Sequence, residues 1–283
     1  MIRFTKMHGA GNDYVYVSCF DQPVPPDPAE LAIKISHRRY GVGGDGLILI
    51  LPSDVADAQM RMFNADGSES EMCGNGIRCV AKYVYDHGIA TTPKLQIETG
   101  AGVLSLELKI ESGRAREITV DMGTPVLEAP SVPTLLATSG PVINQELKIG
   151  GRTFPVTCLS MGNPHCVVFV DQADDDWVLK IGPQVEQDPR FPKRTNVEFV
   201  EVLSRGEVRQ RTWERGSGET WACGTGASAV CVAGVLTGRT DETIVNHLIG
   251  GDLTLHWDRA ANRVLMTGGA EEVFSGTWPW DAL

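Results

Sequence analysis

An internal repeat limits what this chain can fold into more than any other feature of its sequence. Residues 63–76 (FNADGSESEMCGNG) align without a gap with residues 213–226 (WERGSGETWACGTG), at a constant offset of 150 residues. Each segment has an aromatic residue ten positions, and a Glu four positions, before a Cys-Gly-x-Gly turn. A second similarity pairs residues 11–15 with residues 162–167 at an offset of 151. The repeat predicts two related halves, each with one such turn.

Short strand-like runs dominate both halves, and turn residues separate them. Helical periodicity is clearest in residues 28–39, 76–87 and 226–236. We predict an α/β (α+β) fold of two pseudo-symmetric domains. The first covers residues 1–123 together with a C-terminal segment of about residues 269–283, and the second covers residues 124–268. The predicted strand runs are residues 14–17, 46–51, 95–98, 103–109, 117–121, 166–170, 196–202, 208–213, 252–257 and 263–267.

Composition excludes several classes of protein. The chain has 283 residues, 42% of them hydrophobic and 22% charged, which is typical of a globular protein and excludes disorder or a coiled coil as the main state. Its formal net charge of −11 repels polyanions, so we expect no nucleic-acid partner and no anionic membrane partner. No apolar run has the length of a membrane span, and the first residues do not resemble a secretory signal. We therefore expect a cytoplasmic protein.

Seven cysteines stand at wide spacings, and no CxxC motif occurs. This pattern favours reduced thiols over a disulfide framework, and predicts no metal site. Most free cysteines are small buried hydrophobic residues, so a chemical role has to be argued from their position.

The two Cys-Gly-x-Gly turns each precede a predicted helix, which gives them two interpretations. In the first, the glycines only permit the turn and the cysteine is inert. In the second, the free amides and the positive end of the helix dipole bind a carboxylate. A cysteine at a helix N-terminus also has a stabilised thiolate, so its pKa is expected to fall below the ordinary value.

Two equivalent thiols suit a particular chemistry. A hydrolase needs unlike groups, whereas inversion of a stereocentre needs two like groups, one to remove a proton and one to supply a proton from the opposite face. Helix N-termini at the α-carboxylate would stabilise the enolate-like charge that develops. No pyridoxal signature is present, so we expect no cofactor. The residues predict a cofactor-independent racemase or epimerase of an α-amino acid, with a small-molecule substrate.

Five motifs together resemble the diaminopimelate epimerase family. The resemblance runs from about residue 4 to about residue 270, and its motifs are residues 7–13, 63–76, 161–165, 195–199 and 214–226. It implies interconversion of LL- and meso-2,6-diaminopimelate, in the biosynthesis of lysine and of peptidoglycan precursors. It also implies a homodimer, and two domains that are each a mostly antiparallel β-sheet curled around a central helix, with the ligand in the cleft between them.

Carried over residue by residue, the resemblance implies that Cys73 and Cys223 are the acid/base pair. It implies that His165 and Glu214 adjust the pKa of the thiols. The implied substrate-binding residues are Asn12, Asn64, Gly74, Asn75, Asn163, Asn196, Glu214, Arg215, Gly224 and Thr225. Their chemistry suits a substrate with an ammonium and a carboxylate at each end, since Glu accepts from an ammonium and Arg binds a carboxylate in bidentate fashion. One family position, often Gln, is Gly46 here, so that contact is absent.

Three alternatives stay open at this point. The first is a proline or hydroxyproline racemase, which resembles this fold and also has paired Cys-Gly-x-Gly turns. Its substrate offers no partner for Arg215 and Asn64. A thiol redox protein would use Cys73 and Cys223, although the chain lacks CxxC. A carboxylate-binding module would bind without turnover.

Overall fold

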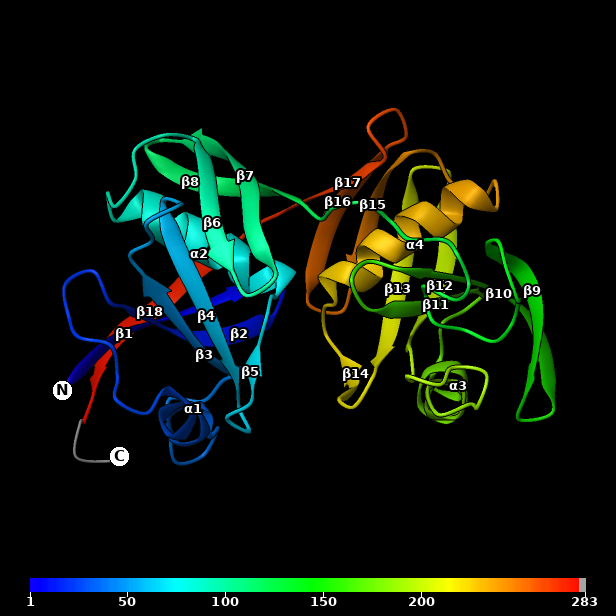
Figure 1. The fold of residues 1–283 in the computed structure, drawn as a ribbon, viewed down its shortest axis with the longest axis horizontal. Helices are drawn as coiled ribbons and strands as arrows, with labels where there is room; N and C mark the ends of the chain where they lie inside the picture. The colour runs from blue at the N-terminus through cyan, green and yellow to red at the C-terminus, as the bar shows by residue number, and fades with distance from the viewer. Residues whose placement is uncertain (280–283) are drawn as a thin grey trace. The chain divides into compact units, whose positions relative to one another are not determined.

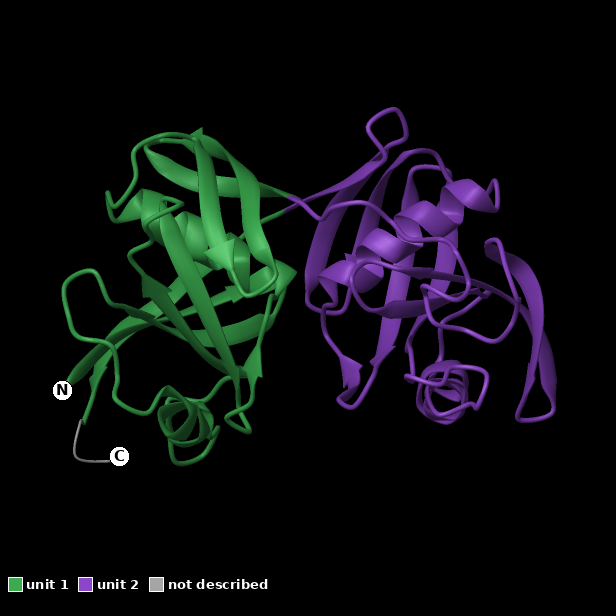
Figure 2. Ribbon diagram, viewed as in Figure 1, with its two compact units in different colours: residues 1–120, 268–283 green, residues 121–267 purple. Residues whose placement is uncertain are grey.

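The computed structural model describes residues 1–279 and divides them into two compact units (Figure 2). Unit 1 comprises Met1–Val120 and the described residues from Gly268 onward, and unit 2 comprises Asp121–Thr267. The expected boundaries after residues 123 and 268 lie close to these divisions. The predicted fold class is confirmed: each unit is a strand-dominated mixed sheet with few helices (Figure 1).

Unit 1 is built around helix α2 (Gly74–Asp86), with a shorter helix α1 (Pro28–Ser36) outside the sheet (Figure 1). Neighbouring strands follow the order β18-β1-β2-β3-β4-β6-β7-β8, and β5 pairs with β4. Pairs β2–β3 and β4–β6 are parallel, and the others are antiparallel. The strand bounds are β1 Ile2–Gly9, β2 Asn12–Ser18, β3 Gly46–Leu51, β4 Ala58–Asn64, β5 Glu69–Ser70, β6 Lys94–Thr99, β7 Gly102–Glu111, β8 Arg114–Asp121 and β18 Glu271–Trp278.

Unit 2 repeats this plan around helix α4 (Gly224–Leu236). Its strands follow the order β9-β10-β11-β12-β13-β15-β16-β17, with β14 paired to β13, and the parallel pairs are β11–β12 and β13–β15. A π-helix, η1 (Asp176–Ile181), leads into α3 (Gly182–Glu186). The strand bounds are β9 Val142–Ile149, β10 Arg152–Ser160, β11 Pro164–Phe169, β12 Asn196–Ser204, β13 Glu207–Glu214, β14 Gly218–Thr220, β15 Thr243–Leu248, β16 Gly251–Asp258 and β17 Arg263–Gly268.

Equivalent residues of the sequence repeat occupy equivalent pairing positions in the two sheets. In unit 1 Tyr14 pairs with Gly46, and in unit 2 His165 pairs with Asn196, which are the corresponding positions. Helix α2 contacts β1, β2, β4, β6 and β7, and α4 contacts β10, β11, β12, β15 and β16. Each sheet therefore curls around its own helix and buries it.

Helix burial follows from sequence. In α4 the segment after the Cys-Gly-x-Gly turn is small and apolar on every side, as expected of a helix that a sheet encloses. Helix α2 also buries two charged side chains, Arg78 and Lys82. Lys82 Nζ pairs with Asp86 at 2.8 Å, one turn further along the same helix.

The predicted end of the first helix is wrong. Helical periodicity extends to residue 39, but α1 ends at Ser36 and His37 has extended backbone angles. The amides of Gly43 and Gly44 donate to the carbonyls of Ile35 and Ser36, so the following loop satisfies the last carbonyls of the helix.

Candidate active site

In unit 1, Cys73 occupies the N-cap position of α2. Its backbone is extended, with φ −139° and ψ 118°, and its Sγ accepts a hydrogen bond from the Gly76 amide at 3.4 Å. Sulfur here replaces the oxygen of an ordinary N-cap side chain. Gly74 and Asn75 form the buried first turn of the helix. The sequence-predicted turn is thus a helix N-terminus with its thiol turned toward the helix amides.

Asn12 links Cys73 to a charged network at the start of β2. The thiol of Cys73 donates to Asn12 Oδ1 at 3.3 Å, and Asn12 Nδ2 donates to Asp45 Oδ2 at 2.7 Å. Arg38 bridges Asp45 and Asp13, with 2.7 Å contacts to each carboxylate. Because the Asp45 contact fixes the direction of the amide, Asn12 presents its oxygen to the thiol.

Asn64 and Gly46 lie at the facing ends of β4 and β3. Asn64 Nδ2 donates to Ser68 Oγ at 3.0 Å, so its side chain turns into the β4–β5 connection. A Cβ atom at Gly46 would lie 2.0 Å from the Phe63 carbonyl oxygen and 2.6 Å from Tyr14 Cε1. In this structure a side chain at position 46 would require a shift of the neighbouring backbone.

In unit 2, Cys223 caps α4 in the same way. Its Sγ accepts from the Gly226 amide at 3.3 Å and lies 3.4 Å from Thr225 Oγ1. Our expectation that the helix N-terminus lowers the thiol pKa is wrong here. Burial raises the pKa of Cys223 well above its ordinary value, and the carboxylates of Glu214 and Glu198 raise it further. Burial and the two nearby carboxyl groups together outweigh the amide and hydroxyl contacts that favour the thiolate.

Glu214 and His165 both lie close to this thiol. Burial raises the pKa of Glu214, while hydrogen bonds from Thr220 and Cys223 and the nearby His165 oppose that shift. The Thr220 hydroxyl donates to Glu214 Oε1 at 2.5 Å. His165 is fully buried, and its Nε2 lies 2.9 Å from Asn163 Oδ1. Unit 2 therefore gathers Cys223, Glu214, His165 and Asn163 in one polar cluster.

Asn196 and Arg215 meet at the edge of the same cluster. The Arg215 amide donates to Asn196 Oδ1 at 2.9 Å, and Asn196 Nδ2 donates to the Pro164 carbonyl at 2.9 Å. The exposed Arg215 side chain donates to the Lys193 carbonyl at 3.1 Å. Gly224 is buried and Thr225 is half-buried in the first turn of α4.

Two buried charged residues next to these sites were missed by our sequence interpretation. Glu198 is fully buried, and its Oε1 lies 2.7 Å from His165 Nδ1. Arg78 is fully buried in α2, and its Nη1 donates to the Gly74 carbonyl at 3.1 Å. A comparison of the repeats beyond residues 63–76 and 213–226 could have found them, because the corresponding residues are Ile48 and Ser228.

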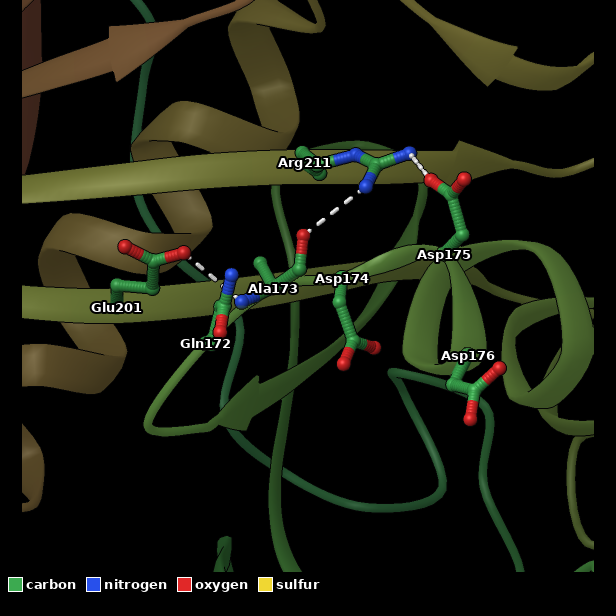
Figure 3. A pocket seen from close by; sticks show the side chains of 7 residues that line it. All are labelled: Gln172, Ala173, Asp174, Asp175, Asp176, Glu201 and Arg211. Carbon is green, nitrogen blue, oxygen red and sulfur yellow. Dashed lines mark hydrogen bonds and ion pairs between the residues drawn. The ribbon is translucent and has the colours of Figure 1, made fainter.

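A separate pocket of about 450 Å³ lies on unit 2, and none of the predicted site residues lines it (Figure 3). Its lining is acidic, and most of its charged side chains form ion pairs. Arg211 contacts Asp175 at 2.8 Å and Glu219 at 2.7 Å, and Glu201 pairs with Arg209 at 2.7 Å. We assign it no role.

Among residues 1–279, no group of three or more His, Cys, Asp or Glu side chains is arranged to hold a metal ion. None of the helices in the same range is long and apolar enough to cross a membrane.

The fold of this chain is shared by several proteins of known structure. A probable proline racemase from Agrobacterium radiobacter superposes with a TM-score of 0.69 at 15% identity, over 99% of this chain and 93% of that one. A phenazine biosynthesis protein of the PhzF family from Bacillus anthracis superposes with a TM-score of 0.69 at 17% identity, over 97% and 98% of the two chains. At these identities the likeness shows the fold alone.

Sequence comparison identifies the family of this chain. The family model described as Diaminopimelate epimerase matches residues 4–128 and 157–273. A Moorella thermoacetica protein named Diaminopimelate epimerase is 52% identical over 280 residues, covering 99% of this chain and 100% of that protein. One of the same name from Desulfovibrio desulfuricans is 54% identical over 282 residues, covering 98% of each. The chain belongs to the diaminopimelate epimerase family.

Proposed function

We propose that this protein interconverts LL- and meso-2,6-diaminopimelate without a cofactor. The observation that carries the proposal is the near full-length identity of 52–54% to proteins named diaminopimelate epimerase. The solved structures of a probable proline racemase and of a hydroxyproline epimerase share the fold at 15% and 16% identity, which gives no comparable support for a proline-type substrate.

In this mechanism Cys73 and Cys223 form the acid/base pair. One thiolate removes the α-proton, and the other thiol delivers its proton to the opposite face of the α-carbon. The amides of Gly74, Asn75, Gly224 and Thr225 stabilise the carboxylate as it takes up enolate-like charge. Each turnover leaves the thiol and the thiolate exchanged, so one proton returns through solvent before the next turnover in the same direction.

The remaining predicted residues recognise the substrate. Asn12, Asn64, Asn163 and Asn196 supply amide donors and acceptors, and Glu214 accepts from an ammonium. Arg215 has an exposed guanidinium that can pair with the distal carboxylate. His165 and Glu214 adjust the ionisation of the thiols. From the family resemblance we further propose a cytoplasmic homodimer that serves lysine and peptidoglycan-precursor synthesis.

To test this, the purified protein is incubated with LL-diaminopimelate without an added cofactor, and the stereoisomers are separated by chiral chromatography. L-Proline and trans-4-hydroxy-L-proline are offered in parallel. We expect meso-diaminopimelate to accumulate to equilibrium and both proline substrates to remain unchanged. Turnover of a proline substrate with no conversion of diaminopimelate would contradict the assigned substrate, and absence of turnover on all three would favour a binding module.

A further inference from the structure

The two helix caps have equivalent geometry but differ in the charge buried beneath them. Position 78 in α2 is Arg, and the corresponding residue 228 in α4 is Ser. Position 198 in β12 is Glu, and the corresponding residue 48 in β3 is Ile. Arg78, Ser228, Glu198 and Ile48 are all completely buried. Each unit therefore holds a charged side chain where the other unit holds an uncharged one, and the two charges have opposite sign.

Arg78 is held against the first turn of α2. Its Nη1 donates to the carbonyl of Gly74, the residue after Cys73, and its Nε donates to the Gly269 carbonyl at 3.3 Å. A Cβ atom at Gly9 would lie 3.0 Å from Nη2, so the backbone of β1 approaches the guanidinium closely. Both of these contacts are to backbone carbonyls, and they orient the guanidinium at the first turn of α2.

Three groups that can carry negative charge interact electrostatically with Arg78: Cys79, Cys73 and Tyr16. Burial raises the pKa of Cys79 to about 11 and raises the pKa of Tyr16 well above its ordinary value, so both are neutral near pH 7. Cys73 is half-buried and is the member of this group that can respond to the guanidinium at neutral pH.

Two dipolar groups contact the Cys73 thiol. Asn12 Oδ1 accepts from the thiol, which favours the neutral form, whereas the Gly76 amide favours the thiolate. Both are dipoles, and a full charge in a desolvated setting outweighs them. Lys82 is the nearest further cation along α2, and Asp86 pairs with it.

The unit 2 thiol has the reverse surroundings. A Cβ atom at Gly226 would lie 2.6 Å from Glu198 Oε1 and 3.2 Å from Cys223 Sγ, so the carboxylate reaches the inner side of the cap. At Gly76 the corresponding point lies 2.7 Å from the Ile48 methyl group. Glu198 Oε1 contacts His165, while Glu198 Oε2 has no hydrogen-bond partner among the described residues. Glu214, on β13, adds a second carboxyl group beside the same thiol.

We propose that Arg78 and Glu198 are positioning residues that make the two thiols unequal, so that Cys73 loses its proton before Cys223. In the resting protein Cys73 is then the base and Cys223 the acid. This inference deepens the proposed function and rests on it for the roles of the two thiols.

The test measures the pH dependence of iodoacetamide alkylation in substrate-free protein, with each cysteine followed separately by peptide mass spectrometry. Thiolates react and thiols do not, so each midpoint reports ionisation without requiring turnover. In the unsubstituted protein we expect a lower midpoint for Cys73 than for Cys223. Because this measurement needs no turnover, a wrong order of the two midpoints is distinguished from an inability to epimerise diaminopimelate.

Four variants assign the difference to the two charges. Arg78→Met should raise the Cys73 midpoint by about one pH unit or more, and Arg78→Lys should restore most of the shift. Glu198→Gln should lower the Cys223 midpoint. Glu198→Asp keeps a carboxyl group, so its Cys223 midpoint should stay closer to that of the unsubstituted protein. The surface substitutions Lys94→Met and Glu242→Gln change the net charge equally and should move neither midpoint. If Arg78→Met fails to fold, Arg78→Lys and both Glu198 variants still decide the question.

Two results would overturn the proposal. One is a Cys73 midpoint equal to or above that of Cys223 in the unsubstituted protein. The other is a folded Arg78→Met or Glu198→Gln variant whose nearby cysteine keeps its original midpoint.

Discussion

Cys73 and Cys223 cap equivalent helices, yet they sit in different chemical surroundings. In both units a thiol accepts from the third amide of the helix, at 3.4 Å in α2 and 3.3 Å in α4. Beyond that shared contact, unit 1 places a guanidinium nearby, and unit 2 places two carboxyl groups and an imidazole nearby. The repeat gives the two caps the same local geometry, and divergence within the repeat gives their thiols different neighbouring charges.

Loss of either thiol should have the largest effect. Cys73→Ala and Cys223→Ala should each reduce epimerisation by about 10²–10⁴-fold or more, because each direction needs one base and one acid. Cys231→Ala is the matched control, since burial raises the pKa of that helix thiol to about 12 and it should stay neutral. Near-normal turnover in a folded Cys223→Ala variant would show that the two thiols do not act as a pair.

A methyl group added at the third residue of each helix should affect the two caps differently. Gly226→Ala places its Cβ against Glu198 Oε1 and Cys223 Sγ, so we expect kcat to fall by about 10²-fold from a misplaced thiol. Gly76→Ala meets the movable Ile48 side chain, so its main cost should be about 1–3 kcal/mol of stability. Steady-state kinetics and urea denaturation of both variants measure the contrast. Equal kcat losses would argue against a special role for the carboxylate beneath the unit 2 cap.

Substrate recognition should also be unequal, because Arg215 corresponds to Ala65 in the repeat. Arg215→Ala should raise KM by roughly 10- to 150-fold, equivalent to about 1.5–3 kcal/mol for a charged hydrogen bond, with a smaller change in kcat. Ala65→Ser, at the corresponding position, is the control and should leave KM unchanged. A normal KM for Arg215→Ala would remove this residue from the binding site.

The smallest expected effects are on the pH dependence of folding stability. One carboxyl group in each unit should change the stability with pH, and the two changes should have opposite sign. Burial raises the pKa of Glu214, so folding favours its neutral form and stability falls as pH rises above the ordinary Glu value of about 4.3. Glu214→Gln should therefore gain stability at pH 7 but not near pH 4. In unit 1, burial works to raise the pKa of Asp13, but hydrogen bonds from Arg38 and Lys6 lower it overall.

Asp13 thus stabilises the fold above the ordinary Asp value of about 3.9, and this contribution is lost as the pH falls through the lowered value. Asp13→Asn should lose stability at pH 7 and match the original protein at lower pH. Urea denaturation of both variants across this range measures the two trends. The same direction of change in both would contradict the opposite assignment.

Local sequence signals predicted the framework of both sites. The Cys-Gly-x-Gly turns and the apolar runs after them gave helices close to α2 and α4, since the cap and the periodicity lie within a few residues of each other. The run at Gly46–Leu51 is fully buried, so its continuous apolar pattern identified β3 directly.

Features set by tertiary contacts were not predicted. Strands β9 and β10 were missed because β9 is largely polar and Pro155 interrupts the pattern of β10. The polar start of η1 gave no helical periodicity. Arg78 and Glu198 were not predicted because residue type alone does not distinguish a buried charged residue from an exposed one.

The most direct test of the account follows isotope in LL-diaminopimelate turned over in deuterated water. If Cys73 removes one hydrogen and Cys223 delivers another, early meso product should carry deuterium at the inverted carbon while recovered LL substrate stays unlabelled. Product that retains the original hydrogen would mean that a single group removes and returns the same proton, and would contradict the two-thiol mechanism.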